Sequence, residues 1–108
     1  MKFTIAPIKL ESLIRAACSA RTKKKANLTL TAVKNRVSVE CNGVVAVSDA
    51  MVRVQGAVTL HAKSLRKVLD TFKGTPLLEI NGSADGLRIQ NFRMGIVSYD
   101  SKPKLPAD

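Results

Sequence analysis

The sequence predicts an α+β fold in which a βαβββ unit occurs twice. The apolar positions of residues 4–14 recur at residues 59–69, an offset of 55, and the alternating apolar positions of residues 28–39 recur at residues 78–89, an offset of 50. A half of about 50 residues is too small to bury a helix and a sheet by itself. The two halves should therefore pack together around one core, with both helices on one face of antiparallel sheets.

The first half contains every element of the unit in turn. Residues 2–5 alternate like a strand, and Pro7 suits a first helical turn. An apolar stripe with helical spacing follows, at Leu10, Leu13, Ile14, Ala17 and Cys18. Residues 28–32 and 37–41 alternate with period 2 around Lys34-Asn35, and Asn42-Gly43 introduces a further strand at residues 44–54.

The second half follows the same order. Residues 58–60 form a short strand, and a second helical stripe follows at Leu65, Val68, Leu69 and Phe72. The segment at residues 73–76, which contains Gly74 and Pro76, ends this helix. Strands are predicted at residues 77–80, 87–90 and 93–99, with a turn at residues 84–86.

The length of 108 residues fits one domain spanning residues 1–108, with pseudo-repeats at about 1–55 and 56–108. Without an apolar run near the roughly 20 residues that cross a bilayer, we expect a cytoplasmic protein. Cys18 and Cys41 share no metal or redox spacing, and both fall in apolar positions. We expect both to be buried thiols in a reducing compartment.

Positive charge is concentrated on the predicted helices. Eighteen lysines and arginines against eight carboxylates give a net charge of +10, which makes a polyanion the expected partner. Ten of these basic residues lie on the two helices, at their ends, or in the loop that follows the first helix. They are Lys9, Arg15, Arg21, Lys23, Lys24, Lys25, Lys63, Arg66, Lys67 and Lys73. Two carboxylates, Glu11 and Asp70, accompany them.

This distribution favours binding to the backbone of duplex DNA. Cations on solvated helix faces contact phosphates and carry no sequence code. Stacking of single-stranded bases needs exposed aromatic residues, and the chain has only Phe3, Phe72, Phe92 and Tyr99, of which Phe3 and Phe72 fit core positions. The alternative is that the lysine-rich helix faces are simply solvated.

Several segments resemble the first domain of the bacterial DNA sliding clamp, the beta subunit of DNA polymerase III. They are the opening residues 1–5, the stretch 58–69, Gly74, residues 78–80 and 86–89, and the closing residues 96–99 and 105–108. The resemblance spans nearly the whole chain and rests on a dispersed pattern. In a clamp, such βαβββ repeats form domains whose helices line the channel of a ring, and whose sheets form the outer wall and pair across domain boundaries.

The resemblance implies a role in DNA replication or repair without enzymatic activity. It places Lys9, Arg15, Lys63, Arg66 and Lys67 toward the duplex and Arg21 and Lys23–Lys25 in a loop that can reach it. A bacterial clamp subunit has three such domains, and two subunits form a ring of six, whereas this sequence supplies one. Replication proteins are then further expected partners, and the chain could equally be the first domain of a longer clamp. No polymerase-binding pocket carries over to these residues.

Catalytic and cofactor sites find no support in the sequence. His61, the sole histidine, has no predictable catalytic partner, and Asp49, Asp85 and Asp100 fall at turns or strand ends. Residues 81–86 read as a hairpin turn because a strand, not a helix, follows them. We therefore expect no cofactor, no metal and no membrane partner.

Two modes of action remain open. Edge strands at residues 44–54 or 93–99 are natural joints for self-association. The alternative is a protein-interaction module with a clamp fold that caps or regulates clamps or binds another acidic partner. Salt sensitivity distinguishes them, because backbone binding weakens with salt more than strand pairing does.

Overall fold

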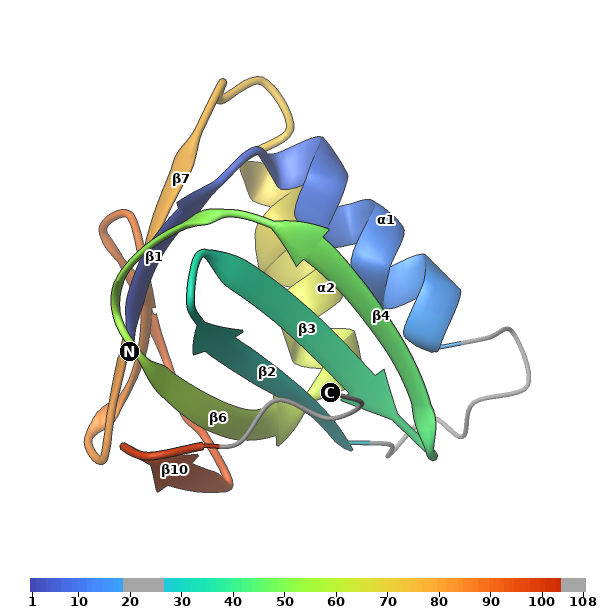
Figure 1. The fold of residues 1–108 in the computed structure, drawn as a ribbon. Coiled ribbons are helices and arrows are strands. Elements are labelled where there is room, and N and C mark those ends of the chain that lie inside the picture. Colours follow the sequence, from blue (N-terminus) through green and yellow to red (C-terminus); the bar gives the residue numbers. More distant parts are fainter. Residues whose placement is uncertain (19–26, 104–108) are drawn as a thin grey trace.

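The computed structural model describes residues 1–18 and 27–103, which form two helices and two five-stranded antiparallel sheets (Figure 1). In chain order the elements are β1 (Lys2–Ile5), α1 (Pro7–Ala17), β2 (Asn27–Val33), β3 (Arg36–Cys41), β4 (Val44–Asp49), β5 (Met51–Val54), β6 (Gly56–His61), α2 (Ala62–Thr71), β7 (Leu78–Ser83), β8 (Gly86–Ile89), β9 (Phe92–Met94) and β10 (Ser98–Asp100). The predicted duplication is confirmed, but four strands and not three follow each helix, so the observed order is βαββββ twice.

The two sheets exchange strands between the halves of the chain. One sheet, here the β7 sheet, has the order β5-β1-β7-β8-β9, and the other, the β2 sheet, has the order β10-β6-β2-β3-β4. The β7 sheet takes β7, β8 and β9 from the second half of the chain, and β1 and β5 from the first half. The β2 sheet takes β2, β3 and β4 from the first half, and β6 and β10 from the second half. Replacing each element by its counterpart in the other half converts one order into the other, which is pseudo-twofold symmetry.

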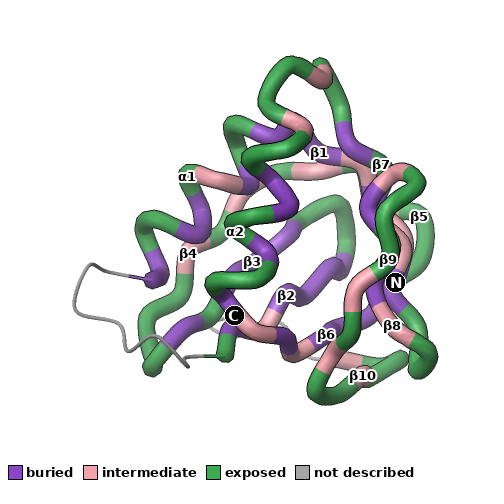
Figure 2. Tube along the Cα trace, turned by 180° about the vertical axis from the view of Figure 1, so that it is seen from behind, coloured by how far each residue is buried: buried purple, intermediate pink, exposed green. Residues whose placement is uncertain are grey.

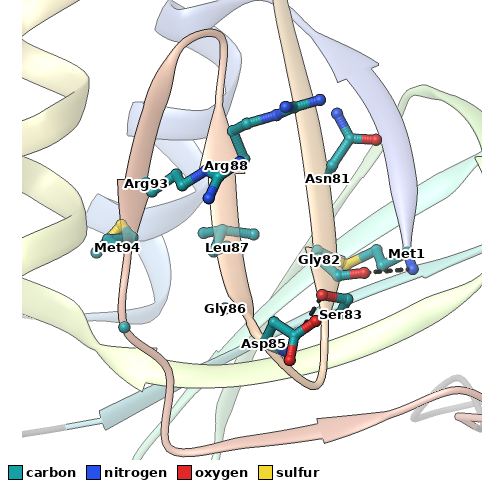
Figure 3. A pocket seen from close by; sticks show the side chains of 11 residues that line it. Met1, Asn81, Gly82, Ser83, Asp85, Gly86, Leu87, Arg88, Arg93 and Met94 are labelled. Atoms are coloured by element: carbon teal, nitrogen blue, oxygen red, sulfur yellow. Dashed lines mark hydrogen bonds between the residues drawn. The ribbon is translucent and has the colours of Figure 1, made fainter.

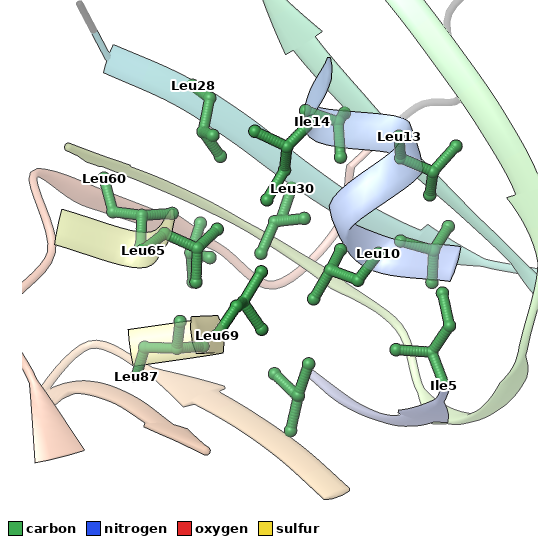
Figure 4. Close-up of a cluster of buried hydrophobic side chains, with 14 of the residues drawn as sticks. Ile5, Leu10, Leu13, Ile14, Leu28, Leu30, Leu60, Leu65, Leu69 and Leu87 are labelled. Carbon is green, nitrogen blue, oxygen red and sulfur yellow. The ribbon is translucent and has the colours of Figure 1, made fainter. Parts of the chain in front are cut away.

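One apolar core joins the sheets and the helices (Figure 4). The predicted stripes are buried on both helices, with Leu10 and Ile14 of α1 and Leu65 of α2 fully shielded from solvent. Alternate residues of the strands, such as Leu30 and Ile80, complete the core. Full burial of a leucine or isoleucine contributes about 1.5–3 kcal/mol, so these positions account for the packing of helices on sheets.

The helices pack against each other as well as against the sheets (Figures 1 and 2). α1 starts at Pro7, as the sequence predicts, and α2 ends before Phe72, which is half-buried. Exposed residues run along the outer side of both helices in Figure 2. The prediction of two helices on one side of antiparallel sheets is therefore confirmed.

The first residue is built into the fold. The ammonium group of Met1 donates a hydrogen bond of 2.9 Å to the carbonyl oxygen of Gly82, and the Gly82 amide donates one of 2.7 Å to the Met1 carbonyl (Figure 3). Met1 is 4% exposed, and burial lowers the pKa of its amino group. The pairing of β1 with β7 thus extends to the end of the chain.

Two predicted strands are each divided between the sheets. The segment at residues 44–54 was expected to be one strand, but it breaks at Ala50, where β4 leaves the β2 sheet and β5 joins the β7 sheet. Asn35 holds this crossover, because its carbonyl accepts from the Ala50 amide at 3.0 Å and its side chain accepts from the Val52 amide at 3.2 Å. Residues 93–99 are divided in the same way into β9 and β10.

All four sheet edges belong to these two segments. β5 and β9 are the edges of the β7 sheet, and β10 and β4 are the edges of the β2 sheet. The predicted location of the edge strands is therefore confirmed, although each segment supplies an edge to both sheets. Gln90, expected within a strand, instead occupies the turn after β8 with a φ of 54°.

Candidate nucleic-acid interface

The predicted DNA-binding residues that the structure describes lie on α1, on α2 and just beyond α2. Arg21, Lys23, Lys24 and Lys25 lie outside the described residues. The six that are described are all exposed; they are Lys9, Arg15, Lys63, Arg66, Lys67 and Lys73. Arg15, Lys63 and Lys67 lie opposite the buried stripe of their helix, Lys9 and Arg66 lie on its flanks, and Lys73 follows the end of α2.

Ion pairing divides these six residues into two groups. Arg15 donates to the Glu11 carboxylate at 2.8 Å, one helical turn away, and the Lys73 Nζ lies 3.3 Å from Asp70. Within residues 1–18 and 27–103, Lys9, Lys63, Arg66 and Lys67 have no carboxylate oxygen within 4.0 Å. These four, here called the helix cations, have no ion-pair partner among the described residues.

The start of each helix lacks the groups that normally stabilise it. Neither α1 nor α2 has a capping side-chain hydrogen bond or an acidic residue in its first turn. Instead Lys9 and Lys63 lie within the first turns. A cation there opposes the helix dipole, which favours negative charge at the N-terminus by about 0.3–1 kcal/mol. A phosphate group has the charge that both positions lack.

The predicted burial of the two cysteines is confirmed, and the structure brings them together. Burial, a hydrogen bond to Cys41 and the charge of that thiol raise the pKa of Cys18 to about 12, while the guanidinium of Arg66 acts in the opposite direction. Cys18 is therefore a neutral thiol near pH 7 and a poor nucleophile.

The described residues offer little support for a catalytic histidine, a metal site or a membrane span. His61 precedes α2, and its side chain makes no capping hydrogen bond. No group of three or more histidine, cysteine, aspartate or glutamate residues within residues 1–18 and 27–103 could hold a metal ion. Within the same residues, the helices are too short and polar to cross a membrane.

Sequence reasoning missed a second cationic feature, on the β7 sheet. Antiparallel pairing places Arg88 of β8 directly opposite Arg93 of β9 (Figure 3). A shallow concavity of about 620 Å³ lies beside them, with Asn81, Ser83 and Asp85 also in its lining. Both arginines are equally far from the turn at residues 90–91, so the register of this hairpin would have revealed the pair.

Comparison with known proteins identifies the fold as that of a single sliding-clamp domain. The whole chain superposes on the Helicobacter pylori beta clamp, solved in complex with carprofen, with a TM-score of 0.81 and 20% identity. It covers 32% of that clamp chain.

Two further solved structures agree. Caulobacter crescentus pol III beta superposes with a TM-score of 0.67 and 20% identity, over 99% of this chain and 30% of that clamp chain. The DNA polymerase III subunit beta from Pseudomonas aeruginosa superposes with a TM-score of 0.62 and 21% identity, over 100% of this chain and 33% of that clamp chain. This chain thus spans about a third of the length of these clamps. No protein-family model and no curated protein sequence matches it.

Proposed function

We propose that this protein is a non-enzymatic, clamp-like domain that binds duplex DNA without sequence preference in replication or repair. One observation carries the proposal: two adjacent helices of a clamp fold present, on their exposed sides, four cations with no ion-pair partner among the described residues. Cations of this kind attract the phosphate backbone and release its counterions, and they do not distinguish base pairs.

The helix starts support the same partner. Lys9 and Lys63 oppose the helix dipoles, so the sequence forgoes stability at two positions that phosphates would favour. Arg15 and Lys73 belong to the proposed interface as well, but release from Glu11 and Asp70 must precede full contact with a phosphate. Arg21, Lys23, Lys24 and Lys25 extend the proposal to the segment after α1.

The likeness to clamps also favours assembly. Four strand edges, β4, β5, β9 and β10, carry backbone groups without a neighbouring strand in the described fold. An unpaired edge invites another strand. We propose these edges as the sites at which further copies or replication proteins complete a larger structure.

Charge reversal tests the DNA contact directly. The variant K63E/R66E/K67E should lose duplex binding by at least 100-fold in fluorescence anisotropy at low salt, because three attractive charges become repulsive. The matched control is R36E/R53E/K102E, which makes the same change in net charge at exposed positions away from the helices. It should lose no more than about tenfold. Equal losses in both variants would mean that net charge alone, and not the helix face, attracts DNA.

A further inference from the structure

The dipeptide Asn-Gly occurs twice in the chain, in two contrasting surroundings. Asn42 and Gly43 form the turn between β3 and β4, whereas Asn81 and Gly82 lie within β7. A glycine that follows an asparagine leaves its own backbone nitrogen unobstructed, because glycine has no Cβ atom. The other asparagines precede larger residues; they are Asn27, Asn35 and Asn91. The two dipeptides therefore share the same local chemistry and differ in what the fold does to them.

The first dipeptide is accessible to water. Asn42 and Gly43 close the hairpin of β3 and β4 (Figure 1). Both are exposed, and their φ angles of 52° and 83° are typical of a two-residue type I′ turn. A Cβ atom on Gly43 would meet no atom within 4 Å. Among the described residues, no backbone carbonyl is found to accept a hydrogen bond from the Gly43 amide.

This end of the hairpin can also open without disturbing the rest of the sheet. β4 is an edge of the β2 sheet, and within the described fold it pairs with β3 alone. Val44 and Val45, the first residues of β4, are both exposed. The end of an edge hairpin opens at a small cost in free energy, whereas a central strand opens only with much of the fold. The backbone of Asn42 can thus leave the turn conformation and bring its side chain to the Gly43 nitrogen.

The second dipeptide is held on both sides. β7 is the central strand of its sheet, where Asn81 pairs with Lys2 of β1 and with Arg88 of β8. Gly82 is buried, and its amide donates the hydrogen bond of 2.7 Å to the Met1 carbonyl. While the strand stays paired, the Gly82 nitrogen keeps its proton in this bond and cannot reach the Asn81 side chain.

We propose that Asn42 is a site of spontaneous deamidation and that the fold protects Asn81 from the same reaction. The backbone nitrogen of Gly43 attacks the side-chain carbonyl carbon of Asn42. A carbon–nitrogen bond forms there, the bond from that carbon to the side-chain nitrogen breaks, and ammonia leaves with the proton of the Gly43 amide. The product is a succinimide ring. This modification goes beyond the proposed DNA contact.

Water then opens the ring at either of its two carbonyl carbons. Addition of water at the side-chain carbon restores the original main chain and leaves an aspartate. Addition at the backbone carbon leaves Gly43 attached through the former side chain, which is an isoaspartate. The whole sequence consumes one water molecule and releases one ammonia, and no electron is transferred. Each conversion replaces a neutral amide by a carboxylate.

The two products should affect the hairpin differently. Asp-Gly suits a type I′ turn as well as Asn-Gly does, so the aspartate form should keep the hairpin. Isoaspartate adds a methylene group to the main chain, which is incompatible with a two-residue turn that places Cys41 opposite Val44. We expect the isoaspartate form to release the start of β4 from β3.

Peptide mapping of aged protein tests the proposal. The wild type is kept at mildly alkaline pH and digested, and mass spectrometry with electron-transfer fragmentation measures aspartate and isoaspartate at positions 42 and 81. Asn42 should convert about tenfold faster than Asn81 or more, because the central strand must open before Asn81 can react. The rate at Asn42 should rise with pH, since the attacking nitrogen must lose its proton.

The same measurement in urea separates the fold from the local sequence. Both dipeptides should then convert at rates within about threefold of each other, because unfolding removes the protection of β7. The matched variant is Gly43→Ala. In urea it should slow conversion of Asn42 by about tenfold or more and leave Asn81 unchanged, since its methyl group obstructs the attacking nitrogen.

Thermal melts test the predicted difference between the products. Ion exchange separates the deamidated forms from the wild type by their added charge. The variant Asn42→Asp should melt within about 2 °C of the wild type, because it keeps the turn. The isoaspartate form should melt at a lower temperature than both.

Two results would overturn the proposal. One is equal conversion of Asn42 and Asn81 in the folded protein. The other is conversion of both residues in urea and of neither in the folded protein, because the turn would then protect Asn42 as well as β7 protects Asn81. An isoaspartate form that melts with the wild type would overturn the predicted loss of register. K63E/R66E/K67E should convert at the wild-type rate within about twofold, so failure of the DNA proposal is read separately.

Discussion

The ammonium group of Met1 donates a hydrogen bond of 3.0 Å to the phenolic oxygen of Tyr99. Met1 extends the strand β1 of the β7 sheet, and Tyr99 lies on β10, an edge of the β2 sheet. The first residue of the chain therefore ties together the two sheets at the place where the halves of the chain exchange strands.

Replacing Tyr99 by Phe should lower the free energy of unfolding by about 1 kcal/mol. The ring and its packing remain, while the buried ammonium group loses one acceptor and keeps the Gly82 carbonyl. Urea denaturation measures the change. A variant as stable as the wild type would show that this hydrogen bond makes no net contribution.

The amino group of Met1 should make stability depend on pH below its ordinary pKa. Burial lowers the pKa of this group from 8.0, so the unfolded chain binds more protons than the folded chain at pH values between the two pKa values. Protonation of the amino group then favours unfolding. The stability that the neutral amino group contributes is fully present above pH 8 and is lost as the pH falls through the pKa of the folded state. Urea midpoints between pH 6 and 9 should show this rise, and Nα-acetylation should flatten it. An unchanged slope after acetylation would assign the rise to other groups.

Gly56 should be intolerant of any side chain. A Cβ atom there would lie 2.7 Å from the Met1 Cβ and 3.0 Å from the Met1 Cα and nitrogen. Because the Met1 backbone is held by Gly82, it cannot move away, and we expect Gly56→Ala to cost about 1–3 kcal/mol.

Gly74 provides the matched control. A Cβ at this position would meet no atom within 4 Å. Gly74→Ala should therefore leave stability within about 1 kcal/mol of the wild type and can raise it by restricting the unfolded chain. Similar losses for the two variants in thermal melts would contradict the close packing of Met1 on Gly56.

Assembly through the strand edges should appear in light-scattering mass on a sizing column. We expect more than one 11.7 kDa copy on each duplex of about 30 base pairs at low salt, after the mass of the DNA is subtracted, because DNA phosphates offset the repulsion between copies. Proline in place of Val45 or Val47 on the edge β4 should reduce this mass, since proline cannot donate in a ladder. A single copy on DNA at every concentration would contradict assembly.

The periodic parts of the fold could be predicted from sequence. Both helices and the hairpin strands follow from apolar stripes with helical or alternating spacing, and those stripes form the core. The division of residues 44–54 could not be predicted, because alternation continues through Ala50 and no glycine or proline marks the break. The position of the break depends on a residue distant in sequence, because Asn35, 15 residues before Ala50, accepts the hydrogen bonds that hold the crossover.

The candidate interface was predictable in its location but not in its ion pairing. Helical spacing places Lys63 and Lys67 opposite the buried stripe of α2 and Arg66 on its flank, and all three are exposed. The spacing of Glu11 and Arg15 allows an ion pair, but whether the pair forms depends on the rotamers of both side chains, which the sequence does not specify. The arginine pair of β8 and β9 required knowledge of the hairpin register, which the turn at residues 90–91 sets.

Salt dependence of duplex affinity tests the central proposal most directly. Anisotropy titrations between about 50 and 200 mM salt, with two duplexes of unrelated sequence, should give equal affinities. The plot of log affinity against log salt should have a slope of roughly −3 to −4 if each of the four helix cations neutralises one phosphate. In K63E/R66E/K67E the magnitude of the slope should fall by about 3, roughly one for each cation removed. An affinity that ignores salt, or that differs by tenfold or more between the two sequences, would contradict backbone binding by the helix cations.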